Sequence, residues 1–167
     1  HDDLSQPVRL ERQAAALKAD PGAVLCCSDA RQLLPDGVGR RIFPGTHTHR
    51  ELHWRLHLSN PIVQSTIMFR KDTVERLGAF MRPGFEYADD FDFYHRLTRY
   101  GRLLHLPECL IFYRLHGRNA ATRYSDVMAE NARKVLAEAY EPLLGKTGPE
   151  VAGYVAQYVA QKRAPRD

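Results

Sequence analysis

Apolar positions in this sequence gather in short blocks separated by turn residues. The continuous apolar run Ala23 to Cys27 is typical of a buried strand. The segment Ile62 to Phe69, rich in β-branched and apolar side chains, predicts a second, interior strand. Leu103 to Leu106 and Leu110 to Tyr113 predict two more strands, separated by a turn at Pro107.

Segments of helical periodicity lie between these blocks. Leu10, Ala14 and Leu17 fall on one face of a predicted helix, which Asp20-Pro21-Gly22 should end. A hairpin is expected at Pro35-Asp36-Gly37, with Arg40 to Phe43 as its return strand. Further helices are expected at Thr48 to Leu58, Lys71 to Leu77 and Asp90 to Tyr100, and two more follow residue 120, separated at Gly148-Pro149.

Helices that alternate with short buried strands predict an α/β layered core. We assign residues 1–120 to this core unit and residues 121–167 to a helical C-terminal appendage. The length of 167 residues suits one ordinary domain, and 44% hydrophobic residues can form its core.

Composition and charge indicate where in the cell the chain is expected and which kinds of molecule it can bind. The chain shows neither a signal peptide nor an apolar run of about 18 residues, so we expect it in the cytosol. Net charge is +4, which suits an anionic substrate or peripheral association with the inner face of an anionic membrane, but equally an ordinary surface. Scattered arginines without interleaved aromatic residues argue against nucleic acid. The adjacent Cys26 and Cys27 indicate buried strand positions rather than a disulfide.

Two acidic clusters are candidates for chemistry: Asp2-Asp3, before the first helix, and Asp89-Asp90-Phe91-Asp92, at the start of a later one. Carboxylates at helix N-termini often serve only as caps. Asp92 can pair with Arg96 four residues on, which leaves Asp89 and Asp90 to find another partner. That partner could be a metal ion, a cationic side chain or a substrate hydroxyl.

His49, His53 and His57 recur every four residues, on one face of a predicted helix. Such spacing can bind zinc, but the glutamate of the metalloprotease motif is absent, and a solvated or cleft-lining face is favoured. Trp54 is interpreted as a core residue, with a sugar-stacking platform as the alternative.

Five segments of the sequence, taken together and in order, match one enzyme family: Asp2 to Gln13, Asn60 to Arg70, Leu77 to Phe80, Asp89 to Leu97, and Leu106 to His116. They resemble the family 2 glycosyltransferases. In that order, they are similar to the segment following the family's DxD motif, the strand leading to the acceptor site, a Gly-Gly-Phe turn, a Glu-Asp-x-Asp helix start, and the closing Pro-Glu and Tyr-Arg-x-His elements.

The resemblance implies a GT-A-type fold, present as its acceptor-side half, and a role for each matching residue. Asp2 matches the second Asp of the DxD motif, a ligand of the divalent metal, and the first Asp would stand immediately before His1. Asp3 and Asp89 match substrate-binding positions, and Asp89 stands where the family more often has Glu. Asp90 matches the catalytic base. His116 matches a histidine near the metal or diphosphate, with a structural hydrogen bond as the alternative.

The activity implied is metal-dependent, inverting transfer of a sugar from a nucleotide-sugar donor to a saccharide or lipid-linked acceptor. Mg²⁺ or Mn²⁺ is the expected cofactor, because oxygen ligands and phosphate suit these cations. Without the family's nucleotide-binding half, the fragment alone is expected to be inactive. The alternative is a non-catalytic module, derived from such an enzyme, that binds a saccharide or a partner protein.

Overall fold

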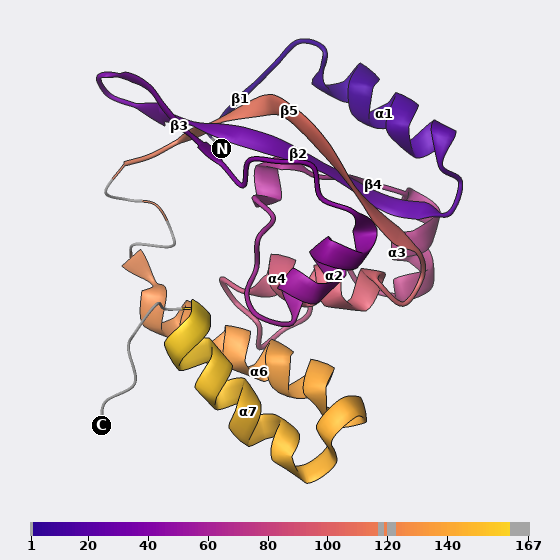
Figure 1. The fold of residues 1–167 in the computed structure, drawn as a ribbon, viewed down its shortest axis with the longest axis vertical. Coiled ribbons are helices and arrows are strands. Elements are labelled where there is room, and N and C mark those ends of the chain that lie inside the picture. The colour runs from indigo at the N-terminus through magenta and orange to yellow at the C-terminus, as the bar shows by residue number, and fades with distance from the viewer. Residues whose placement is uncertain (1, 117–118, 120–122, 161–167) are drawn as a thin grey trace.

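The computed structural model describes residues 2–116, 119 and 123–160, with the backbone alone at 158–160. Within this part of the chain, five strands form one mixed sheet, and the fold is mixed α/β (Figure 1). Two long strands, β2 (Ala23–Leu34) and β5 (Arg102–Arg114), run parallel at its centre. The others pair antiparallel with these two: β1 (Leu4–Ser5) with β5, and β3 (Gly37–Ile42) and β4 (Met68–Phe69) with β2.

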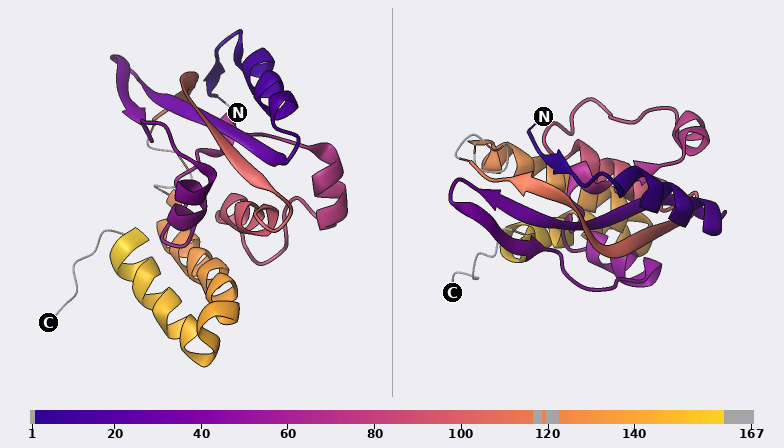
Figure 2. Two further views of the ribbon diagram at one scale, coloured as in Figure 1. Left: turned by 45° about the vertical axis from the view of Figure 1, so that its right-hand side comes forward. Right: turned by 90° about the horizontal axis from the view of Figure 1, so that it is seen from above.

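Helices cover both faces of the sheet (Figures 1 and 2). One face carries α1 (Arg9–Ala19). The other carries α2 (His49–Leu56) and α4 (Asp89–Leu97), and the antiparallel pair α6 (Ser125–Leu144) and α7 (Gly148–Tyr154) packs beyond these two helices. The shorter elements are α3 (Lys71–Leu77), the 3₁₀ turns Gln64–Thr66 and Gly145–Thr147, and the π-helical segment Val155–Ala160.

The main core lies between β2, β5 and the α2–α4 layer. Phe93, Tyr94 and Leu97 of α4 are completely buried there. Leu136 of α6 and Ala152 of α7 belong to the same buried cluster, so the C-terminal helices share this core. The division at residue 120 stays a prediction.

Several predicted elements are confirmed. The buried strand at Ala23–Cys27 is the first part of β2, and both cysteines in it are free and buried. The hairpin follows as β2 and β3. Helices form at the four expected places before residue 101, although their ends differ by a few residues from the predicted ranges. Gly78 ends α3 in the left-handed conformation that glycine favours.

The predicted buried face of α1 is wrong in part. Leu17 is buried as that face requires, but Leu10 is 61% exposed and Gln13, which is not one of the three predicted residues, is completely buried. The Gln13 amide donates to the carbonyl oxygens of Cys26 (3.1 Å) and Thr66 (2.7 Å). These bonds join α1 to β2 and to the 3₁₀ turn Gln64–Thr66. A buried polar side chain with such partners can replace an apolar one at the helix interface.

The predicted interior strand Ile62 to Phe69 is also wrong for most of its length, since only Met68–Phe69 is a strand. Local hydrogen bonds hold the preceding segment in a compact turn. Asn60 Oδ1 accepts from the Ile62 N–H (3.1 Å), and the Thr66 hydroxyl donates to the Val63 carbonyl (2.7 Å). Such side-chain bonds compete with strand pairing.

A turn at Pro107 is not formed, because β5 runs continuously through it. Ser28 pairs with Leu106 and Asp29 with Cys109, so Pro107 and Glu108 are two extra residues in a bulge. Proline has no N–H to donate, and a bulge is one of the few strand positions that tolerates it.

Within the described residues, no helix is long and apolar enough to cross a membrane.

Candidate functional site

Four carboxylates from two distant parts of the sequence line one cavity of about 470 Å³, here called the acidic cavity. Asp2 and Asp3 come from the segment before β1, and Asp89 and Asp90 from the first turn of α4. The remaining lining residues are Ile42, Ile62, Val63, Gln64, Ser65, Tyr87, Tyr113, Asn119 and Met128. The structure therefore brings the two acidic clusters of the sequence together.

The end of β5 holds the Asp2–Asp3 segment in place. The Arg114 N–H donates to Asp3 Oδ1 (2.9 Å), and Arg114 Nε donates to the Asp2 carbonyl (3.0 Å). Pairing of Leu4 with Phe112 continues the same contact into the sheet. Strand pairing thus places the first acidic cluster beside the C-terminal end of β5.

His116 contacts the first cluster directly. Its Nε2 lies 2.8 Å from Asp2 Oδ2. Desolvation raises the pKa of Asp2, but the hydrogen bond with His116 and other charge effects outweigh it, so the pKa of Asp2 lies below its usual value. Two predicted site residues that lie far apart in the sequence are therefore in direct contact.

Asp90 lies between polar groups and the core. Its Oδ1 accepts from the Phe91 N–H (2.7 Å), and its Oδ2 accepts from Asn60 Nδ2 (3.0 Å). Burial raises the pKa of Asp90 to about 6, and the neighbouring Asp89 acts in the same direction. The helix N-terminus favours the ionised carboxylate, but burial is the larger effect. It remains mostly ionised at pH 7 while becoming a stronger base.

Asp92 is structural, as the sequence predicted. It is 2% exposed and accepts from Arg96 Nε at 2.7 Å. Arg82 also donates to both of its oxygens, and its pairing with Glu138 extends this network to α6. These contacts occupy Asp92 fully and leave it no part in the cavity.

Tyr87 was not identified from the sequence, although it lines the acidic cavity. Its φ of 64° is unusual for a residue with a side chain and often occurs at functional sites. The Tyr87 ring stacks on Tyr124 at 4.2 Å between centroids. Backbone conformation of this kind has no signal in a single sequence. From the sequence, Asn60 was identified as the first residue of the segment that resembles the strand leading to the acceptor site, with no role of its own.

A divalent cation fits these residues only with help from a ligand. Among the residues described, no group of three or more His, Cys, Asp or Glu side chains is arranged to hold a metal. Asp2 and His116 offer two adjacent donors. Mg²⁺ sites often use one or two protein carboxylates and take their other oxygens from water and substrate phosphates.

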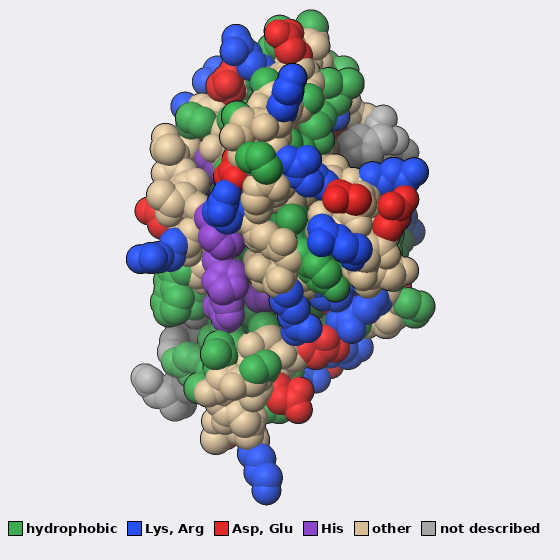
Figure 3. Space-filling view, turned by 90° about the vertical axis from the view of Figure 1, so that its right-hand side faces the viewer, with side chains coloured by type: hydrophobic (Ala, Val, Ile, Leu, Met, Phe, Trp, Pro, Cys, Tyr) green, Lys and Arg blue, Asp and Glu red, His purple; other side chains and the backbone are tan. Residues whose placement is uncertain are grey.

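His49, His53 and His57 make contacts within the fold. Their rings form a column in which His49, His53 and His57 follow one another at 5.8 and 5.0 Å, part of the histidine stripe in Figure 3. His49 Nδ1 accepts from the Leu103 N–H (3.1 Å), and His57 Nδ1 lies 2.9 Å from the His53 carbonyl. These contacts, and the absence of a metal-type cluster in the described regions, weigh against zinc.

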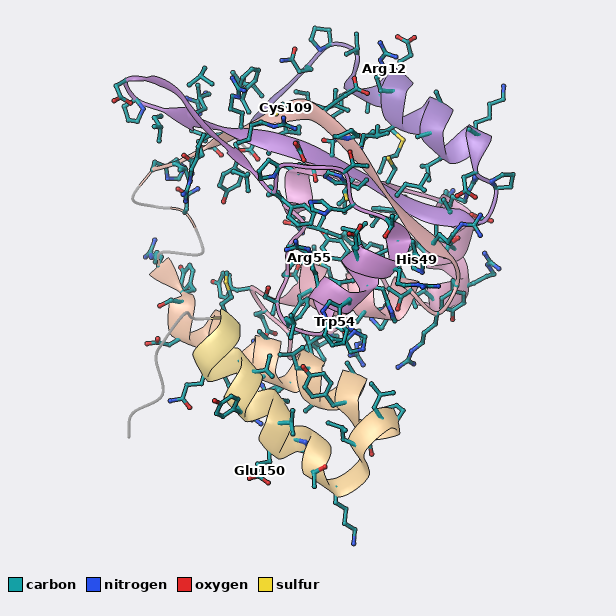
Figure 4. The ribbon with its side chains drawn as sticks, in the orientation of Figure 1. Arg12, His49, Trp54, Arg55, Cys109 and Glu150 are labelled. Atoms are coloured by element: carbon teal, nitrogen blue, oxygen red, sulfur yellow. The ribbon has the colours of Figure 1, made fainter. Side chains whose placement is uncertain are left out.

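Trp54 is not a core residue, contrary to the favoured interpretation. It projects from α2 and is 65% exposed (Figure 4). It does not line the acidic cavity, so a stacking role there has no support.

Comparison with known proteins gives one informative match. No protein-family model matches the chain. It is 28% identical over 103 residues to an uncharacterized glycosyltransferase of Haemophilus influenzae. The match covers 62% of this chain and 32% of that protein, so the chain spans about a third of the relative's length. The chain is thus distantly related to a glycosyltransferase.

Proposed function

We propose that this chain is the acceptor-side part of a metal-dependent, inverting glycosyltransferase of the GT-A type, similar to family 2. The donor is a nucleotide sugar, and the acceptor is a hydroxyl of a saccharide or a lipid-linked molecule. The observation that carries the proposal is the position of Asp90, a carboxylate with a pKa of about 6 in a cavity with three other carboxylates. The distant similarity to a glycosyltransferase supports the same assignment.

Asp90 is the proposed general base. One carboxylate oxygen takes the proton of the acceptor hydroxyl while the hydroxyl oxygen attacks the anomeric carbon of the donor sugar. The diphosphate leaves from the opposite face of that carbon as its bond to the carbon breaks, so the configuration at the carbon is inverted. Asn60 orients Asp90 through its hydrogen bond, and Asp89 is proposed to bind acceptor hydroxyls.

Asp2 and His116 are the proposed holders of Mg²⁺ or Mn²⁺, and Asp3 supports them by fixing the segment to β5. The cation, when bound with the donor, would stabilise negative charge on the leaving diphosphate. Its four carboxylates, with no lysine or arginine among the described lining residues, make the acidic cavity suited to a cation and to hydroxyl groups.

The test is turnover by the full-length protein carrying Asp90→Asn. Asn keeps the size of the side chain and can accept from the Phe91 N–H, but it cannot take a proton. Transfer should fall by about 10²- to 10⁴-fold, the usual contribution of a general base. Because the pKa of Asp90 is about 6, kcat/KM of the unmodified enzyme should also fall below pH 6 as the base becomes protonated.

Asp126→Asn is the matched control, because Asp126 also lies in the first turn of a helix but faces neither Asp90 nor Asp2. Its turnover should be unchanged, and donor affinity should persist in both variants. Near-normal turnover of Asp90→Asn would remove Asp90 from the mechanism, whereas no transfer by the unmodified full-length protein would favour the non-catalytic binding module. Lost donor binding would make Asp90 a donor-site residue.

A further inference from the structure

A second cavity of about 340 Å³ opens on the other side of Asp90, and we call it the apolar cavity. It lies between the segment after α2, the start of α4 and the inner face of α6. Its wall is hydrocarbon for most of its area, from Leu58, Phe91, Met128, Ala132, Leu136 and Ala156. Polar side chains stand near Asp90, where Ser59 and Asn60 enter the lining.

Charge in the apolar cavity excludes an anionic occupant. Asp90 is the one charged side chain among the described residues of its lining, and no lysine or arginine stands there. A phosphate or carboxylate placed in this cavity would lose its water without gaining a cationic partner, and it would lie beside a carboxylate. The cavity therefore favours an uncharged group.

The two cavities share a boundary, since Tyr87, Asp90 and Met128 line both. A molecule that fills the apolar cavity with a hydrocarbon group can therefore present an attached hydroxyl to Asp90. The same hydroxyl would face the acidic cavity, on the side where Asp2 and His116 lie.

The wall at Tyr87 is held in place by α6. The Asn131 side chain of α6 is 4% exposed and donates from Nδ2 to the Glu86 carbonyl (2.8 Å). The next residue, Tyr87, has its strained φ and stacks on Tyr124. The Asn131 bond and the Tyr87–Tyr124 ring contact, both made within the chain, therefore hold this wall of the cavity in place.

We propose that the apolar cavity binds an uncharged hydrocarbon group of the acceptor, attached next to the hydroxyl that receives the sugar. This inference rests on the proposed function, because it takes Asp90 to be the base. It narrows the acceptor to a molecule that is apolar beside its reactive hydroxyl, rather than one sugar in a wholly polar chain.

The probe is a series of straight-chain 1-alkanols, from butanol to octanol, titrated into the full chain. NMR signals of the Met128 methyl group and of Ala132 report binding in the cavity. Each methylene buried should lower Kd by about fourfold until the cavity is full. A Kd that does not change with chain length, or shifts confined to the exposed Leu143 and Tyr154, would overturn the proposal.

Ala132→Leu places extra volume in the apolar cavity and should weaken octanol binding at least tenfold. Ala137→Leu is the same change on the same helix, outside both cavities, and should leave Kd unchanged. Equal Kd values for both variants and the unmodified chain would count against the site. The alkanol series on the unmodified chain needs no variant, so a folding defect in Ala132→Leu does not remove the test.

Binding of alkanols requires no donor, which separates the two proposals. Transfer by the full-length protein without length-dependent alkanol binding overturns this inference and leaves the proposed function intact. Alkanol binding without any transfer overturns the proposed function, and with it the assignment of the hydrocarbon group to an acceptor.

Discussion

Two aspartates of one helix turn show how surroundings decide the role of a residue. Asp92 is enclosed by the guanidinium groups of Arg82 and Arg96, so its charge is fully compensated. Asp90, two positions earlier, receives one backbone N–H and one amide N–H but no cation. Burial without a cation leaves its ionised form in a costly state, which raises its pKa.

This cost predicts that Asp90→Asn makes the protein more stable at neutral pH. The folded pKa of about 6 lies above the ordinary value of 3.8, so the folded state favours the protonated carboxyl. Its stabilising effect is complete below pH 3.8 and is lost as pH rises through 6. At pH 7 the variant should gain about 1–3 kcal/mol in the free energy of unfolding, since each pKa unit corresponds to about 1.4 kcal/mol.

Urea unfolding at pH 7 and at pH 4 measures this difference. At pH 4 both proteins have a largely neutral group at position 90, so the gain should nearly disappear. A variant that is less stable than the unmodified protein at pH 7 would show that the Asp90 carboxylate stabilises the fold instead.

At the scale of elements, the pattern of apolar residues correctly predicted those segments whose structure depends only on burying apolar side chains. The run Ala23 to Cys27 is buried as expected, and its side chains are all apolar or cysteine. The pattern failed where polar side chains make long-range or local bonds. Gln13 is buried through its bonds to Cys26 and Thr66, and Asn60 turns the chain where a strand was expected.

Gly101 shows such a constraint at the join between α4 and β5. A Cβ at this position would lie 2.5 Å from the Gly22 carbonyl oxygen and 2.6 Å from Val24 Cγ1. The Arg102 N–H donates to the same carbonyl at 2.9 Å, so the two loops before β2 and β5 cannot separate without losing this bond. Gly101→Ala should therefore lower the free energy of unfolding by about 1–3 kcal/mol.

Gly153→Ala in α7 is the control, because the nearest atom to its Cβ would be Arg133 Cδ at 3.9 Å. Alanine in a helix should stabilise the protein by about 0.5–1 kcal/mol. Both values come from urea unfolding. Equal effects of the two substitutions would contradict the close contact at Gly101.

At the scale of the molecule, the sequence supplied the acidic residues of the site but not its shape. Resemblance to a family linked Asp2, Asp90 and His116, and the structure places the two aspartates in one cavity, with His116 on Asp2. The apolar wall could not be predicted, because it depends on how α6 packs against the segment around Tyr87. Contacts between distant segments leave no periodic signal in one sequence.

The two ends of α4 should give the whole molecule opposite responses to pH. At its C-terminal end, the neutral His95 ring donates from Nε2 to the Leu56 carbonyl (2.8 Å), joining α4 to α2. Burial lowers the pKa of His95 to about 4, with His57 and His53 nearby acting in the same direction. The unfolded chain takes up this proton near pH 6.5, so stability is lost as pH falls from 6.5 to 4.

We therefore expect the free energy of unfolding to fall by about 2 kcal/mol between pH 7 and pH 5 on account of His95. Asp90 offsets part of this loss, since its own contribution grows as pH falls. In His95→Gln the amide can still donate to Leu56, but the group does not titrate. Urea unfolding of the variant should show a smaller loss between pH 7 and pH 5, whereas Asp90→Asn alone should show a larger net loss, because the offset from Asp90 is removed. An unchanged pH dependence in His95→Gln would show that His95 is already protonated in the folded protein or does not control its stability.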